Sequence, residues 1–331
     1  MIIDARAYAR AGLLGNPSDG YFGKTISLIV KNFGAQVLLY ESPELVIEPQ
    51  ESDSNTFSSM HQLRETVSLT GYNGGIPIVK AAIKKFLDHC ELADIRIANR
   101  NFTIRYHSSI PRQVGLAGSS AIVIATLRAL MKFYEVDIEP SILASVALKA
   151  ETEEMGINAG LQDRVIQAWE GCVYMDFEKE NLLKTGIGKY EALDVSLLPN
   201  LYIAYKTDLS KVSGKVLNDI KVRFEKGDSL VIDTLARIAE IASEGKIALE
   251  NRDYPKLHQL INENFDNRCK IMNISASNME LVNTARSTGA SAKFTGSGGS
   301  IIGMYEDDEM LNRLQISLKK INARVIKPYF N

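Results

Sequence analysis

Residues 111–121 read Pro-Arg-Gln-Val-Gly-Leu-Ala-Gly-Ser-Ser-Ala and are the most informative segment of the chain. Gly115 and Gly118 mark a turn, and the apolar run that follows predicts a helix beginning near Gly118. Glycine lets a backbone approach a ligand closely, and a helix begins with unpaired N–H groups and a positive dipole end. The segment therefore predicts a phosphate site, where Ser119 and Ser120 could hold a phosphate oxygen or Mg²⁺. The alternative is a serine that caps an ordinary core helix.

Two common phosphate-binding loops do not fit this segment. The Gly-x-x-x-x-Gly-Lys-Ser/Thr loop needs a lysine directly after its second glycine, where this chain has Ser119. The spacing also differs from the Gly-x-Gly-x-x-Gly turn of dinucleotide-binding folds. The 4 histidines have no metal or triad spacing, and no Gly-x-Ser-x-Gly elbow is present, so hydrolase classes are excluded.

Three segments of the chain together resemble the GHMP small-molecule kinases. Residues 111–121 are similar to the central ATP-binding motif of that family. Residues 8–19 resemble its first motif, a basic residue on a strand followed by a Gly-x-x-x-Asp turn, and residues 293–299 resemble its glycine-rich third motif. The resemblance covers essentially the whole chain and implies a two-lobed α+β fold.

Within this superfamily the chain is most similar to the plant-type glucuronokinases. The similarity is carried by residues 6–10, 15–19, 110–113 and 159–164. Ala117 is a departure, because those proteins more often have a serine or another small residue there. The change is small and is compatible with the same loop geometry.

The resemblance implies an ATP site in the central motif, with an adenine pocket formed from the loop between residues 50 and 70 and from nearby strands. The expected ATP and phosphate contacts are Pro111, Gly115, Leu116, Ala117, Gly118, Ser119, Ser120 and Ala121. Mg²⁺ favours few protein oxygens beside phosphate oxygens, so one serine and one glutamate suffice. Ser120, with Ser119 next, and Glu151 are the expected ligands, since Glu151 matches the metal glutamate of the family. A solvated acidic helix end is the alternative, and it is what we expect of Glu153 and Glu154.

Two further residues match the catalytic pair of the family. Asp163 corresponds to the aspartate that acts as a base or an electrostatic anchor for the hydroxyl under attack. Arg10 corresponds to the cation that pairs with this aspartate and stabilises charge on the transferred group. The alternatives are a helix cap for Asp163 and a strand-surface arginine for Arg10.

Several polar turns are candidates for sugar binding. The expected substrate-binding residues are Asn16, Asp19, Tyr72, Arg164, Gly296, Gly298 and Gly299. A uronate carboxylate calls for a planar cation, which we expect from Arg164 or Arg112. Either arginine could instead form a structural ion pair with the acidic cluster at residues 151–154, and the glycines could form a tight turn between strands.

Composition narrows the class of protein. The chain has 331 residues, 45% hydrophobic and 24% charged, as in an ordinary globular enzyme. A net charge of −2 argues against a general nucleic-acid binder. The 3 cysteines follow no disulfide or metal pattern, and neither a signal-peptide core nor a membrane-length apolar run is seen. We therefore expect a cytoplasmic protein that binds no membrane.

Apolar periodicity predicts mixed helices and strands. The predicted strands are residues 25–30, 36–40, 45–48, 101–107, 172–175, 201–205, 291–295, 300–305 and 323–327. The predicted helices are residues 77–87, three pieces from 118 to 168 broken at 137–140 and 156–160, and about 211–226, 229–250, 254–272, 277–288 and 309–320. Breaks within 185–199 predict an N-terminal ATP-binding domain at 1–190 and a C-terminal α/β sandwich domain at 191–331.

The leading functional hypothesis is an ATP-dependent sugar-1-kinase that converts D-glucuronate to D-glucuronate 1-phosphate, as a monomer or homodimer. The alternatives are another anomeric kinase, for galacturonate, a heptose phosphate or galactose, and a non-catalytic sugar sensor. The joint presence of Arg10, Ser120, Glu151 and Asp163 argues against a sensor.

Overall fold

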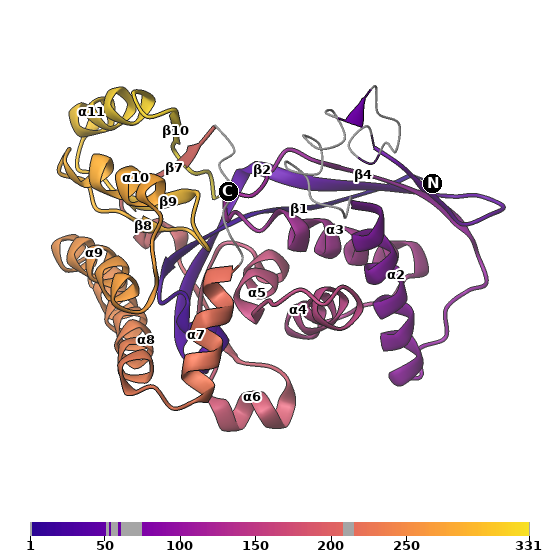
Figure 1. The fold of residues 1–331 in the computed structure, drawn as a ribbon. Coiled ribbons are helices and arrows are strands. Elements are labelled where there is room, and N and C mark those ends of the chain that lie inside the picture. Colours follow the sequence, from indigo (N-terminus) through magenta and orange to yellow (C-terminus); the bar gives the residue numbers. More distant parts are fainter. Residues whose placement is uncertain (1, 51–52, 54–58, 61–74, 208–214, 331) are drawn as a thin grey trace. The chain divides into compact units, whose positions relative to one another are not determined.

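The computed structural model describes residues 2–50, 53, 59–60, 75–207 and 215–330 (Figure 1). Contacts divide the chain into two compact units. The first contains Met1–Ala9, Asn32–Arg112 and Ala117–Trp169, and the second contains Arg10–Lys31, Gln113–Leu116 and Glu170–Asn331. The strands β1 (Ile2–Leu14) and β2 (Lys24–Glu41) each continue from one unit into the other.

In the first unit, helices pack against an antiparallel pair of strands. β2 pairs with β4 (Phe102–Ser108) in the register Ala35↔Ser108 to Glu41↔Phe102, and β3 (Val46–Glu48) runs parallel to β4. At the start of β1, Ile3, Ala5 and Ala7 are buried while Ile2, Asp4 and Arg6 are exposed, so one face of this part of the strand is covered. Figure 1 shows the helices of this unit together on one side of the strands: α2 (Gly75–Leu92), α3 (Gly118–Tyr134), α4 (Pro140–Lys149) and α5 (Leu161–Trp169).

The second unit has an antiparallel sheet of its own. Its strand order is β10-β7-β9-β8, with β7 (Leu201–Lys206), β8 (Lys293–Phe294), β9 (Ser300–Met304) and β10 (Ala323–Ile326). The helices are α7 (Lys215–Glu225), α8 (Ser229–Glu250), α9 (Tyr254–Ile271), α10 (Ala276–Arg286) and α11 (Asp308–Lys319). Tyr202, Phe265 and Phe294 lie in the apolar core that joins this sheet to its helices.

The α+β prediction is confirmed, and so are the two breaks between α3, α4 and α5. The segment after Phe177 is more regular than predicted. α6 (Lys179–Thr185) is capped by the Glu178 carboxylate and ends at Gly186 in the left-handed region, and β6 (Lys189–Leu193) pairs with β5 (Cys172–Asp176). Because the two units interleave along the chain, the division at residue 190 stays a prediction.

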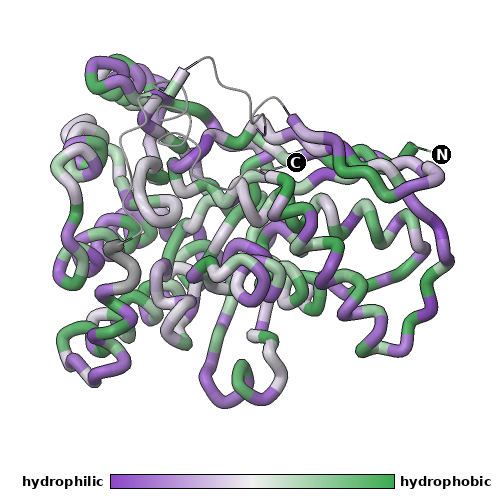
Figure 2. The backbone as a smooth tube through the Cα atoms, turned by 45° about the vertical axis from the view of Figure 1, so that its right-hand side comes forward, coloured by the Kyte–Doolittle hydropathy of each residue, from purple (hydrophilic) through white to green (hydrophobic). Residues whose placement is uncertain are grey.

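Hydrophilic residues are interspersed along the helices (Figure 2). Within the described ranges, no helix combines the length and the apolar character needed to cross a membrane.

Candidate active site

The central motif turns sharply just before α3. Ala117 precedes the helix with φ 58°, in the left-handed region, and its carbonyl accepts a hydrogen bond from the Ala121 N–H at 3.2 Å. A Cβ built on Gly118 would approach the nearest described atom, in Ile110, no closer than 3.4 Å, and the φ of Gly118 is not positive. The fold therefore does not require glycine at residue 118, and the absent side chain leaves space at the start of α3.

Gly115 brings the central motif against the glycine-rich third motif, within the second unit. Its φ is +73°, and a Cβ there would lie 2.8 Å from the Gly298 carbonyl oxygen. A Cβ on Gly296 would lie 2.5 Å from the Gly115 oxygen, and Gly298 and Gly299 both have positive φ. These glycines are thus needed for packing and backbone conformation, which is the structural alternative to a ligand role. Their substrate contacts stay predictions.

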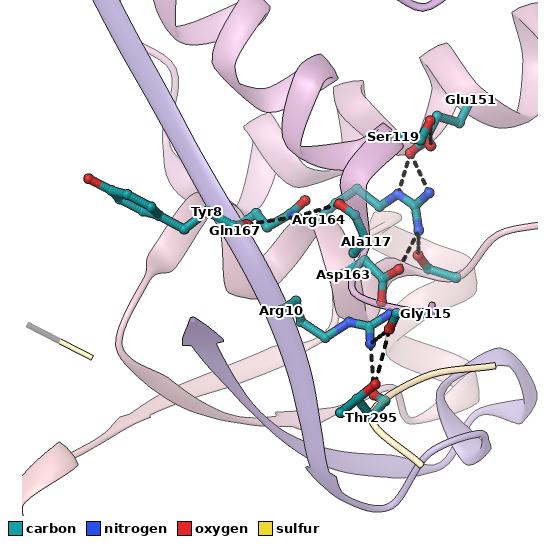
Figure 3. Close-up of polar contacts among 11 residues, drawn as sticks. Tyr8, Arg10, Gly115, Ala117, Ser119, Glu151, Asp163, Arg164, Gln167 and Thr295 are labelled. Carbon is teal, nitrogen blue, oxygen red and sulfur yellow. Dashed lines mark hydrogen bonds and ion pairs between the residues drawn. The ribbon is translucent and has the colours of Figure 1, made fainter. Parts of the chain in front are cut away.

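Glu151 is buried between two donors in the first unit (Figure 3). It lies in a π-helical turn, Ala150–Glu154, that continues α4; such turns are frequent at functional sites. Ser119 donates to Glu151 Oε1 at 2.9 Å, and Arg164 donates to Oε2 through Nε at 2.7 Å and through Nη2. This ion pair is the structural alternative considered for Arg164. The binding of a substrate carboxylate by Arg164 stays a prediction. The other candidate for that contact, Arg112, is exposed.

The neighbouring acidic residues behave differently from Glu151. Lys85 pairs with Glu153 at 2.7 Å and Glu154 at 2.9 Å, and Lys84 pairs with Glu154 at 2.9 Å. The hydrogen bonds from Lys85 and Lys84 lower the pKa of Glu154. Both carboxylates therefore take part in the surface ion pairs expected of a solvated helix end.

Asp163 lies in the first turn of α5, where an acidic side chain interacts favourably with the helix dipole. Its side chain is 22% exposed, and Oδ2 lies 3.6 Å from Arg164 Nη1. In the second unit, Arg10 is buried on β1 and its Nη1 donates to the carbonyls of Gly115 at 3.0 Å and Thr295 at 2.7 Å. Arg10 and Asp163 fall in different units, and their pairing stays a prediction.

The turn after β1 is held by buried amide and ammonium groups. Asn16 Oδ1 accepts from Lys293 Nζ, and the Asn16 carbonyl accepts from Asn264 Nδ2 at 3.2 Å. Asp19 lies in the short 3₁₀ helix Ser18–Tyr21 that follows. Tyr72 and the expected adenine loop lie largely outside the described residues.

Sequence reasoning missed Gln167, which is fully buried on α5, one turn after Asp163 (Figure 3). Its Nε2 donates to the carbonyls of Tyr8 and Ala117, both at 2.9 Å. One side chain thereby ties the turn before α3 to β1 and to the helix that carries Asp163. The available signal was a glutamine within the apolar run of residues 165–168.

Replacing Gln167 with methionine is expected to raise the KM for ATP several-fold and to lower the free energy of unfolding by about 1–3 kcal/mol. Methionine is similar in shape to glutamine but has no N–H group, so two buried carbonyls lose their hydrogen-bond donor. Gln167→Glu keeps the shape but places carboxylate oxygens against the carbonyls, so its effect should be larger. Steady-state kinetics and denaturant unfolding measure both quantities. An unchanged KM in both variants would leave Gln167 a purely structural role.

Comparison with known proteins agrees with the three motifs. The family described as GHMP kinases N terminal domain matches residues 77–171, and GHMP kinases C terminal matches residues 246–320. The chain is 44% identical over 306 residues to Glucuronokinase 1 of Arabidopsis thaliana, an alignment that covers 91% of this chain and 84% of that protein. This chain belongs to the GHMP kinase family.

This GHMP kinase is also similar to a second plant protein and to a solved galactokinase structure. It is 43% identical over 308 residues to Probable glucuronokinase 2 of Arabidopsis thaliana, covering 91% of this chain and 84% of that protein. The crystal structure of Lactococcus lactis galactokinase complexed with galactose superposes with a TM-score of 0.76 at 14% identity, covering 99% of this chain and 93% of that one. That likeness shows the shared fold, and the predicted resemblance to GHMP kinases and to glucuronokinases is confirmed.

Proposed function

We propose that this GHMP kinase transfers the γ-phosphoryl group of ATP to the anomeric hydroxyl of D-glucuronate, giving D-glucuronate 1-phosphate and ADP. The observation that carries the proposal is the 44% identity to Glucuronokinase 1 over 91% of the chain. The geometry of the central motif supports it, because no described side chain caps the start of α3 at Ala117 and Gly118 leaves space there. The phosphate contacts of residues 111–121 are part of this proposal.

The donor set beside α3 is compatible with Mg²⁺. Glu151 and Ser119 supply hard oxygen atoms in contact with each other, and the buried Ser120 and Ser119 both stay candidate ligands. Mg²⁺ at nucleotide sites is held by one or two protein oxygen ligands together with phosphate oxygens, so these residues suffice. When bound, such an ion neutralises charge on the phosphates.

The acceptor side depends on the carboxylate of Asp163. In the proposed reaction it orients the anomeric O–H and accepts its proton as the new O–P bond forms and the bond to ADP breaks. Arg164, 3.6 Å away, holds this side chain beside the buried Glu151. Arg10 fixes the Gly115 and Thr295 carbonyls with one nitrogen, which orients its guanidinium in the second unit.

A coupled ADP-release assay tests the proposal with D-glucuronate, D-galacturonate, galactose, glucose and heptose phosphates as acceptors. We expect D-glucuronate to give the highest kcat/KM, with phosphate on the anomeric oxygen by ³¹P NMR. Turnover of galactose or a heptose phosphate equal to that of glucuronate would overturn the uronate assignment. Sugar binding without ADP release in the presence of Mg²⁺ would favour a sensor.

The proposal also includes the compartment, the oligomeric state and the partners of the protein. The three cysteines are free, with Cys90 and Cys172 buried, as in proteins of a reducing compartment. We propose a cytoplasmic monomer or homodimer whose partners are ATP and a uronic acid, with no nucleic acid and no membrane.

A further inference from the structure

Three cations are buried close together in the second unit. Arg10 on β1, Arg268 in the last turn of α9 and Lys293 on β8 are 5%, 2% and 1% exposed. Burial, followed by the charges of Arg268 and Arg10, holds the pKa of Lys293 well below its usual range. A cluster of like charges in a desolvated place is unfavourable unless an anion compensates it.

Lys293 has a structural explanation. Its ammonium group donates to the carbonyls of Gly12 at 2.7 Å and Phe294 at 2.8 Å, and to Asn16 Oδ1. All three protons of the group are thereby used. Lys293 therefore fixes the turn at Asn16 and adds positive potential without offering a donor.

Arg268 is not satisfied in the same way. Its Nη1 donates to the Gly296 carbonyl at 2.8 Å, its Nε contacts the Met272 sulfur at 3.0 Å, and its guanidinium lies 5.1 Å from the centre of the Phe294 ring. Within the described part of the chain, Nη2 has no hydrogen-bond acceptor and the guanidinium forms no ion pair. Burial lowers the pKa of Arg268 to about 10, and the charge of Asp19 opposes this shift.

A second arginine of this unit provides a comparison for Arg268. Arg286 on α10 also lies over an aromatic ring, with 5.2 Å to the centre of Phe265, and donates to two carbonyls. Unlike Arg268, it has a carboxylate of its own, Asp266, at 2.7 Å. Arg286 is also less buried, with 24% of its side chain exposed against 2% of Arg268, so Arg268 combines deeper burial with the lack of a described carboxylate at ion-pair distance.

We propose that Arg268 recognises the carboxylate of the uronic acid substrate. The inference rests on the proposed function and assigns the carboxylate contact to Arg268 in place of Arg164, whose guanidinium is already paired with Glu151. A guanidinium is suited to a carboxylate because its planar donors match both oxygens. Arg268 also holds Gly296 and interacts electrostatically with Asp19, two residues expected to contact the sugar.

The test compares D-glucuronate with D-glucuronamide, in which an amide replaces the carboxylate at nearly the same shape. Binding is measured calorimetrically without ATP, and kcat/KM is measured with ATP. We expect the wild-type protein to favour glucuronate by roughly 10²–10⁴-fold, because the amide leaves a buried charge unpaired. Arg268→Met should bring the ratio to within a few-fold, Arg268→Lys should give an intermediate ratio, and the KM for ATP should change little in both.

Arg286→Met is the control, because it removes an arginine of the same unit that also lies over an aromatic ring and donates to backbone carbonyls. We expect it to lower stability and to keep the wild-type ratio. An Arg268→Met protein that keeps the ratio, or loses affinity for both ligands equally, would overturn the inference, as would a wild-type protein that binds both ligands equally. A wild-type protein that prefers glucuronate in the binding measurement but releases no ADP would contradict the proposed kinase function alone.

Discussion

Asp163→Asn is expected to reduce turnover by roughly 10²–10⁴-fold, the range found when a positioned general base is lost. Asparagine keeps the shape of the side chain but removes the charge that lies 3.6 Å from Arg164 and the capacity to accept a proton. Because the change is on the acceptor side of the proposed reaction, the affinity for ATP should change little. Single-turnover kinetics with D-glucuronate and equilibrium binding of ATP measure the two quantities.

The start of α11 supplies a control for the role of Asp163 in its helix. Asp308 is also an acidic residue in the first turn of a helix, with its side chain 86% exposed. Asp308→Asn therefore removes the same interaction with a helix dipole without affecting turnover. An Asp163→Asn enzyme that retains more than half of the wild-type turnover would limit Asp163 to this helix-start role.

Glu151→Gln is expected to have two large effects that can be separated. It leaves the Arg164 guanidinium buried without its carboxylate, which should lower the free energy of unfolding by about 3–5 kcal/mol. It should also raise the Mg²⁺ concentration needed for half-maximal activity, because a carboxylate is a stronger ligand than an amide. Urea unfolding without Mg²⁺ measures the first effect, and a Mg²⁺ titration of activity measures the second.

The double variant Glu151→Gln/Arg164→Met separates the two roles. Removing the unpaired guanidinium should recover most of the lost stability, since an apolar side chain replaces a buried charge. The Mg²⁺ requirement should stay raised. Glu153→Gln, whose partner is Lys85 on the surface, should change neither quantity. If Glu151→Gln and Glu153→Gln gave the same Mg²⁺ titration, Glu151 would serve stability alone.

Local sequence patterns predicted much of the fold because they depend on nearby residues. The start of α3 at Gly118 and the breaks on both sides of α4 follow from glycine, proline and apolar spacing. The sequence also separated Glu151 from Glu153 and Glu154, because Glu151 matches the metal glutamate of the family and the other two were expected at a solvated helix end.

The polar contacts that sequence reasoning missed depend on long-range packing. Gln167 contacts Tyr8, and Arg268 contacts Gly296, across separations that leave no periodic signal in the chain. For Arg164, the carboxylate and ion-pair interpretations were equally compatible with the sequence. The structure decides between them, because Glu151 lies on the π-helical turn where Arg164 donates to it.

The hydrogen bonds that fix β1 and the turn after it join residues that are far apart in the sequence. Lys293 reaches Gly12 across 281 residues, and Arg10 reaches Thr295 across 285. During synthesis on the ribosome, the first motif therefore emerges long before the partners that fix it. Its buried arginine and asparagine must stay hydrated until the third motif has left the exit tunnel. Assembly of this turn is thus a late event, because it waits for residues made about 280 positions after the first motif.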